Sequence, residues 1–187
     1  MVIKLAILQI CQVFFRNLEA KAFELSIDKD GEVKPQTLPL ESGGSIQIRG
    51  SIDRVDVYDF NGEKYVRVID YKSGVKKFKL SDILDGLNLQ MFVYLFALYD
   101  DKNAALNGVP AGVLYMHAAR NILNFNSPIE AKNNLENKKE SRFKMNGIVL
   151  SDNDNAIAKA MEHELEGKYI PVSASTKGIK GDLITLE

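Results

Sequence analysis

The chain has 187 residues, of which 45% are hydrophobic and 26% charged, and its formal net charge is −1. This length and composition predict one globular domain with a substantial core. The near-zero charge excludes a nucleic-acid binder that relies on overall positive charge, while the local basic stretches 72–79 and 138–144 are compatible with either DNA contact or an ordinary solvated surface.

The cysteine count and the N-terminal segment bear on the setting of the protein. Cys11 is the single cysteine, which excludes an internal disulfide framework and any iron–sulfur site built from this chain alone, and fits a reducing, cytoplasmic environment. Residues 2–13 are apolar but include one lysine and two glutamines, so neither a signal peptide nor a membrane span is expected. We expect a helix over 2–19 with one buried face, and its abrupt start suggests a piece of a longer protein.

The next stretch of sequence predicts strands. Residues 22–27 resemble a strand, whereas 28–44, with two prolines and three glycines, are typical of turns or a loop. Residues 46–60 are rich in β-branched side chains, Asn61-Gly62 is a strong signal for a two-residue turn, and 64–71 resume the strand pattern. We therefore expect a β-hairpin here.

The second half of the chain alternates between apolar and polar segments. The expected elements are a helix over 83–99 capped by Ser81, a strand over 112–117, a strand over 147–150 and a helix over 152–167 capped by Ser151. Between them, residues 120–142 are polar and rich in asparagine, which favours a mobile surface loop or an insertion. From Pro171 onward the chain is expected to be extended or disordered.

The end of the expected hairpin carries charges that need an explanation. Asp70 and Lys72 share a strand face with Val66 and Val68, because side chains alternate along a strand. Taken alone, an Asp-x-Lys triplet is more often a surface salt bridge. Asp53, however, lies in the paired strand, where a plausible register brings its carboxylate beside that of Asp70. Two such oxygen donors with a nearby carbonyl suit Mg²⁺ or Mn²⁺.

Three ordered motifs carry a family resemblance. They are Gly50-Ser51-Ile52-Asp53-Arg54-Val55-Asp56, Val68-Ile69-Asp70-Tyr71-Lys72-Ser73-Gly74 and Gln90-Met91-Phe92-Val93-Tyr94. They resemble the G-x-I-D-R-x-D, D-Y-K-S-G and Q-x-x-x-Y motifs of RecB-like PD-(D/E)XK nucleases. Residues 86–91, 111–115 and 144–150 further resemble the C-terminal nuclease domain of the AddB component of AddAB-type helicase–nucleases.

The resemblance implies a fold, an activity and a partner. The fold is α/β with a restriction-endonuclease-like core, in which a mixed central sheet is flanked by helices. It implies a single nuclease domain over 1–187, with its core at about 21–170, cut from a longer helicase–nuclease subunit. The implied function is metal-dependent hydrolysis of DNA, as an exonuclease, during the processing of double-strand ends for recombinational repair together with an AddA-like partner.

The same resemblance implies roles for individual residues. Asp53 and Asp70 would be ligands of Mg²⁺ or Mn²⁺, the Tyr71 carbonyl would complete the protein's share, and Lys72 would orient the attacking water and stabilise developing charge. Gln90 and Tyr94 lie one helical turn apart and can reach the site together to hold Lys72 or a phosphate. The alternative for both is core packing, which suits Tyr94 better than the polar Gln90.

The chain departs from the family pattern in two respects. AddB-type domains usually carry four cysteines that hold an iron–sulfur cluster, so with one cysteine no cluster is expected in this chain. Many members also place a histidine or glutamate upstream of the first core strand, for which Glu19 and Glu24 are the substitutes here. His117 and His163 lie downstream, and we expect them to be structural or surface residues.

Asp56 and Arg54 belong to the first motif but need not contact a metal. Asp56 lies three residues from Asp53, hence on the opposite strand face, where a supporting salt bridge with Arg54 or Arg67 is expected.

The alternatives to a helicase-attached nuclease are a standalone RecB-like exonuclease and a catalytically silent nuclease fold that binds DNA or assists assembly. The sequence contains no Walker-type phosphate loop, so this chain is not the ATP motor.

Overall fold

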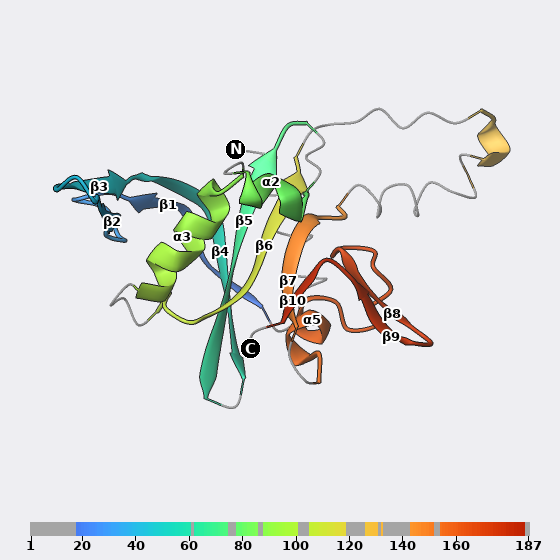
Figure 1. Cartoon of the computed structure of the whole chain (residues 1–187). Coiled ribbons are helices and arrows are strands. Elements are labelled where there is room, and N and C mark those ends of the chain that lie inside the picture. Colours follow the sequence, from blue (N-terminus) through green and yellow to red (C-terminus); the bar gives the residue numbers. More distant parts are fainter. Residues whose placement is uncertain are drawn as a thin grey trace.

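A six-stranded mixed sheet organises the computed structural model, which describes residues 18–60, 62–74, 78–85, 88–100, 105–118, 126–130, 132, 143–151 and 154–185 (Figure 1). In sheet order the strands are β1 (Glu19–Ile27), β4 (Gly50–Phe60), β5 (Glu63–Lys72), β6 (Val109–His117), β7 (Asn146–Ser151) and β10 (Leu183–Thr185). The expected mixed central sheet is therefore confirmed.

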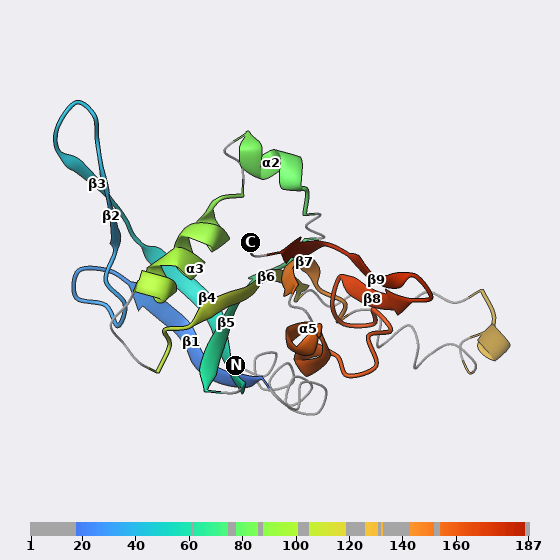
Figure 2. The same cartoon turned by 60° about the horizontal axis from the view of Figure 1, so that its bottom comes forward.

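Within the described residues, two ribbons and three helices accompany this sheet. The ribbons pair β2 (Gln36–Pro39) with β3 (Ser45–Ile48) and β8 (Val172–Ser175) with β9 (Gly178–Gly181). The helices are α2 (Leu80–Leu84), α3 (Gln90–Asp100) and α5 (Ala156–Met161). The β2–β3 ribbon projects away from the sheet, as Figure 2 shows.

Strand directions explain where the helices lie. β1, β4 and β5 pair antiparallel, β5 and β6 pair parallel, and β6 and β7 pair antiparallel again. Parallel neighbours cannot be joined by a tight turn, so the chain must cross one face of the sheet between β5 and β6. That crossover contains α2 and α3, and it brings α3 over the sheet.

The two faces of the sheet belong to different hydrophobic clusters. Val68 and Val113 pack in the cluster that contains α3, whereas their chain neighbours Ile69 and Leu114 pack in the cluster that contains α5. Adjacent residues of a strand point to opposite faces, so α3 and α5 cover opposite sides of the sheet. Figure 2 shows the sheet running between them.

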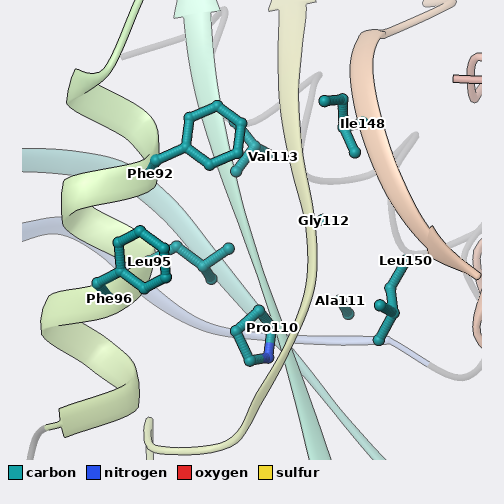
Figure 3. Close-up of a pocket in the computed structure, with 9 residues that line it drawn as sticks. All are labelled: Phe92, Leu95, Phe96, Pro110, Ala111, Gly112, Val113, Ile148 and Leu150. Atoms are coloured by element: carbon teal, nitrogen blue, oxygen red, sulfur yellow. The ribbon is translucent and has the colours of Figure 1, made fainter. Parts of the chain in front are cut away.

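An apolar cleft of about 180 Å³ lies between α3 and the strands β6 and β7 (Figure 3). All nine lining residues are apolar or glycine: Phe92, Leu95, Phe96, Pro110, Ala111, Gly112, Val113, Ile148 and Leu150. Such a lining offers neither a proton donor nor a metal ligand. The cleft is therefore distinct from the charged residues that end β5.

Two predicted helices were wrong in extent. The helix expected over 83–99 is divided into α2 and α3, and Asn88, between them, has the left-handed φ of +58° that interrupts a helix. The helix expected over 152–167 is limited to α5. Its N-cap is Asn155 rather than Ser151, which is the last residue of β7.

The buried Glu162 explains the early end of α5. Its carboxylate accepts hydrogen bonds from the backbone N–H groups of Lys168, Tyr169 and Ile170 at 2.9, 3.0 and 3.2 Å. The chain after Met161 must fold back for these contacts to form, which is incompatible with a continuing helix. Three N–H donors also compensate the cost of burying the carboxylate.

The other expectations on loops and termini have mixed outcomes. The segment 28–44 is not wholly a loop, because it contains β2, and the C-terminal residues are extended as β8, β9 and β10. Residues 1–17 lie outside the described residues, and Glu19 already belongs to β1. Most of 120–142 also lies outside them, although 126–130 includes the start of a helical turn. Of the described helices, none is long and apolar enough to cross a membrane.

Candidate active site

The β4–β5 hairpin brings the two aspartates of the motifs to the same level. The predicted hairpin is confirmed: Arg54 pairs with Ile69 and Val55 with Val68. One step beyond the last pair, Asp53 is level with Asp70. Residues that oppose each other across an antiparallel pair share a face, so both aspartates lie on the face of Val55 and Val68, beneath α3.

Asp53 is tied to the backbone of β5. Its Oδ2 accepts a hydrogen bond from the Tyr71 N–H at 2.7 Å. In a strand, the N–H and C=O of one residue point to the same neighbouring strand, so the Tyr71 carbonyl also lies on the β4 side. The Asp53 carboxylate and the Tyr71 carbonyl are thus on one side of β5.

Asp70 and Lys72 form an ion pair at the end of β5. The Lys72 Nζ lies 2.6 Å from the Asp70 Oδ2, and the Asp70 residue is only 8% exposed. A carboxylate with so little contact with water needs a compensating charge, which the lysine supplies. The ammonium also lies 6.0 Å from the centre of the Tyr115 ring. The structure therefore brings Asp53, Asp70, Tyr71 and Lys72 together.

Tyr115 is a neighbour of the site that the sequence analysis did not single out. Parallel pairing of β5 with β6 sets it level with Asp70. Burial, and secondly the negative charge of Asp70, raise the pKa of the Tyr115 phenol, so its hydroxyl stays protonated at neutral pH. The available signal was its place near the end of a strand that could pair with β5, which requires knowledge of a non-local contact.

Gln90 and Tyr94 contact each other at the beginning of α3. The Gln90 Nε2 donates a hydrogen bond to the Tyr94 hydroxyl at 2.8 Å. Tyr94 is 4% exposed and packs in the core beneath α3. A Cβ at position 50 would lie 2.0 Å from the Tyr94 hydroxyl oxygen, so only glycine lets the phenol approach β4 this closely. The Gln90–Tyr94 pair therefore lies beside Gly50, which precedes Asp53 by three residues in β4.

The reverse face of the hairpin holds a buried ionic cluster. Asp56 is level with Arg67, and its Oδ2 accepts hydrogen bonds from the Arg67 Nε and Nη2 at 2.9 and 2.7 Å. Its Oδ1 accepts a hydrogen bond from the Arg54 Nε. The expected supporting role of Asp56 is confirmed, with both arginines as partners. The cluster joins the two strands that carry Asp53 and Asp70.

The remaining candidates have separate positions. His117 ends β6, and its Nε2 lies 3.0 Å from the Ser73 carbonyl oxygen. His163 follows α5, is exposed and contacts Glu164, which confirms its surface position but not its place on a helix. Glu19 pairs with Lys21 at the far end of β1. In β1, Phe23 pairs with Arg54 and Leu25 with Ile52, so Glu24 is level with Asp53. Glu24 has a φ of +53°.

The donors at the hairpin end suit a hard divalent cation. Within the described residues, no three histidine, cysteine or acidic side chains gather into a metal-binding group. A cation would therefore rely on the carboxylates of Asp53 and Asp70 and the Tyr71 carbonyl, which lies on the Asp53 side. All three are oxygen donors, as Mg²⁺ and Mn²⁺ prefer, and this small set leaves positions for water and phosphate.

Comparison with known proteins places this site in a family. The family model described as the PD-(D/E)XK nuclease superfamily matches residues 9–169. Proteins named as the B subunit of an ATP-dependent helicase/deoxyribonuclease, from Clostridium botulinum and Clostridium acetobutylicum, are each 35% identical to this chain, over 166 and 162 residues. The protein of that name from Acetivibrio thermocellus is 33% identical over 169 residues.

The coverage of these matches is uneven. They include 87%, 83% and 88% of this chain, but only 14%, 13% and 14% of the respective relatives. The chain thus spans about one seventh of the length of the relatives it matches. The family model, by contrast, covers most of the chain and includes all three motifs of the site. The chain belongs to the PD-(D/E)XK nuclease superfamily.

Proposed function

We propose that this chain is a DNA nuclease that hydrolyses phosphodiester bonds, as an exonuclease, with Mg²⁺ or Mn²⁺ held by Asp53, Asp70 and the Tyr71 carbonyl. One observation carries the proposal. Two aspartates on neighbouring strands are level with each other, and the ammonium of Lys72 lies 2.6 Å from one of their carboxylates. Metal-binding oxygen donors with a cation beside them can together stabilise the negative charge that develops when a phosphodiester is hydrolysed.

The residues of the site have separable tasks. When bound, the divalent cation supplies Lewis-acid stabilisation of the negatively charged phosphate. Lys72 orients the attacking water and stabilises the negative charge that grows on the phosphate oxygens as the water oxygen bonds to phosphorus and one ester P–O bond breaks. Asp70 holds the Lys72 ammonium on the reacting side of the sheet. The nearly buried position of Asp70 strengthens these electrostatic interactions, because water screens them less.

Gln90 and Tyr94 complete the proposed site from α3. Gln90 is exposed and donates to the Tyr94 hydroxyl. Its second amide hydrogen and its carbonyl oxygen give it the capacity to hold Lys72 or a DNA phosphate at the same time. Tyr94, fixed against Gly50, keeps this glutamine in place.

The setting proposed for the chain is a larger helicase–nuclease. Relatives that are about seven times longer carry the name of the B subunit of an ATP-dependent helicase/deoxyribonuclease. We therefore assign this chain to one nuclease domain over 1–187, with its core at about 21–170, in a cytoplasmic enzyme with an AddA-like partner. Its task there is to process double-strand DNA ends for recombinational repair.

A metal-dependent nuclease assay tests the proposal. The intact protein, with any partner that co-purifies, is given end-labelled duplex, single-stranded and circular DNA with Mg²⁺, Mn²⁺ or EDTA. We expect cleavage with either cation, none with EDTA, and resistance of circular DNA, since an exonuclease needs an end. Asp70→Asn should lower the rate by about 100-fold or more, because it removes a charged metal ligand and the partner of Lys72.

Asp59→Asn is the matched control for this substitution. Asp59 is an exposed aspartate of β4, level with Lys64 near the tip of the same hairpin. Its loss should leave cleavage unchanged. DNA binding without any metal-dependent cleavage by the parent protein would overturn the proposal in favour of a catalytically silent nuclease fold.

A further inference from the structure

The end of β5 that carries Lys72 is held mainly from β6. On the β4 side, backbone pairing stops at Arg54 and Ile69, three residues before Lys72. On the β6 side, pairing continues to the last residue of the strand, where Lys72 is level with His117. Besides the Asp53 side chain, which accepts a hydrogen bond from the Tyr71 N–H, the backbone contacts that fix the position of Lys72 therefore come from the end of β6.

Two hydrogen bonds hold the end of β5, one from the last residue of β6 and one from the residue that follows it. The Ala118 N–H donates to the Lys72 carbonyl oxygen at 2.9 Å, and the His117 Nε2 lies 3.0 Å from the carbonyl oxygen of Ser73. A carbonyl oxygen can only accept, so the His117 Nε2 carries the hydrogen and donates it. The carbonyls of Lys72 and Ser73, which lie on either side of the Ser73 Cα, are thus fixed.

These two hydrogen bonds affect the position of the Lys72 side chain. Fixing the Lys72 carbonyl limits rotation about the Lys72 Cα–C bond, next to the atom from which the side chain starts. Fixing the Ser73 carbonyl limits rotation at Ser73, so that the chain that follows cannot pull the Lys72 carbonyl out of place. The side chain then extends to Asp70, with its ammonium 2.6 Å from the carboxylate and 6.0 Å from the Tyr115 ring. Freedom at Ser73 would let the ammonium move away from this place.

We propose that His117 is a positioning residue for Lys72, which acts through the Ser73 carbonyl and keeps the ammonium aligned for phosphodiester hydrolysis. The proposal rests on the function proposed above, because its effect on rate presupposes that Lys72 acts in cleavage. It assigns His117 a task that a surface histidine lacks. Imidazole is suited to it, since its ring is rigid and its Nε2 reaches a backbone carbonyl at the end of the adjacent strand.

The test compares four variants of the intact protein, with any partner that co-purifies. His117→Ala removes the donor, His117→Phe removes the donor but retains a ring, and His117→Gln retains an N–H donor at a similar distance from the backbone. His163→Ala is the matched control, because it removes the only other histidine, whose side chain is 87% exposed. Each variant is checked for unchanged unfolding temperature before its activity is compared.

Single-turnover cleavage and DNA affinity are then measured separately. His117→Ala and His117→Phe should lower the cleavage rate at saturating DNA by about 10- to 100-fold, as small displacements of a catalytic group do. DNA affinity should change by less than about 2-fold, because Lys72 alignment matters most in the transition state. His117→Gln should recover most of the rate, and His163→Ala should match the parent.

A second readout does not depend on cleavage. NMR spectra of the isotope-labelled histidine side chains should contain a protected Nε2–H signal that persists in His163→Ala and disappears in His117→Ala. The Ala118 amide should exchange faster with solvent in His117→Ala and His117→Phe but not in His117→Gln. This readout separates failure of the inference from failure of the proposed function, because it tests the hydrogen bond between His117 and the Ser73 carbonyl even if the parent cleaves no DNA.

Defined results would overturn the inference. Equal rates for the Gln and Phe variants, whether both low or both like the parent, would show that the donor is irrelevant. A loss confined to DNA affinity would mean that His117 contacts DNA instead. An Nε2–H that exchanges freely, or an Ala118 amide unaffected by His117→Ala, would show that the hydrogen bond does not hold the strand end.

Discussion

Replacing Asp56 by alanine tests how the hairpin that carries the site is held together. Asp56 and Arg67 are both 0% exposed, and one carboxylate accepts three hydrogen bonds from two guanidinium groups. The substitution leaves two positive charges without this partner in the interior. Removing one member of a buried ion pair costs about 3–5 kcal/mol, because the remaining charge keeps its desolvation penalty.

The size of this effect makes it easy to measure. Natural domains are stable by about 5–15 kcal/mol, so the substitution should remove a large share of the free energy of unfolding. In urea, where small proteins lose about 1–3 kcal/mol per molar denaturant, the unfolding midpoint should fall by about 1–5 M. Asp59→Ala, at an exposed position of the same strand, should change the free energy of unfolding by less than about 0.5 kcal/mol.

A double-mutant cycle identifies the origin of the loss. Once Asp56 is gone, Arg67→Ala should cost less than it does in the parent, with a coupling of about 0.5–3 kcal/mol between the two residues. The reasoning would be refuted if Asp56→Ala unfolded at the same urea concentration as Asp59→Ala with an unchanged slope. A coupling of zero would likewise show that the contact does not stabilise the hairpin.

Two further substitutions test local packing by urea unfolding. Gly50→Ala should cost about 1–3 kcal/mol, because its Cβ would lie 2.0 Å from the Tyr94 hydroxyl oxygen, and this cost should shrink in a Tyr94→Ala background. Equal costs in both backgrounds would contradict the contact. Glu162→Ala leaves three backbone N–H groups without their acceptor and should cost about 1–3 kcal/mol, whereas the exposed Glu164→Ala should cost less than about 0.5. A similar loss of unfolding free energy for Glu162→Ala and Glu164→Ala would contradict a stabilising role for the hydrogen bonds of the Glu162 carboxylate.

The parts of the fold that follow local rules were predictable from the sequence. The β4–β5 hairpin was indicated by alternating apolar residues and by the Asn-Gly sequence between its strands, and Gly62 has the φ of +84° that is typical of such turns. Its alternation also placed Asp70 and Lys72 on one face and Asp56 on the other. The core of the candidate site was therefore accessible without a structure.

The parts that depend on contacts between distant segments were not predictable. The early end of α5 depends on the Glu162 carboxylate, which binds backbone that follows the helix. β10 pairs in parallel with β7, and no local pattern specifies that partner. Tyr115 and His117 join the site only because β6 pairs in parallel with β5. The break between α2 and α3 falls within 85–90, where a glycine and polar residues alternate with leucines, so here the sequence did offer a local signal for the left-handed Asn88 that was missed.

The most direct test of the proposed nuclease is single-turnover DNA cleavage with Mg²⁺ by Lys72→Ala, measured beside DNA affinity at several salt concentrations. The control is Lys64→Ala, at the other end of β5. If Lys72 stabilises charge in the transition state, its loss should lower the rate by about 100- to 1,000-fold and leave affinity almost unchanged. Undiminished cleavage, with only weaker binding and a salt dependence reduced by about one phosphate contact, would contradict a catalytic role for this lysine.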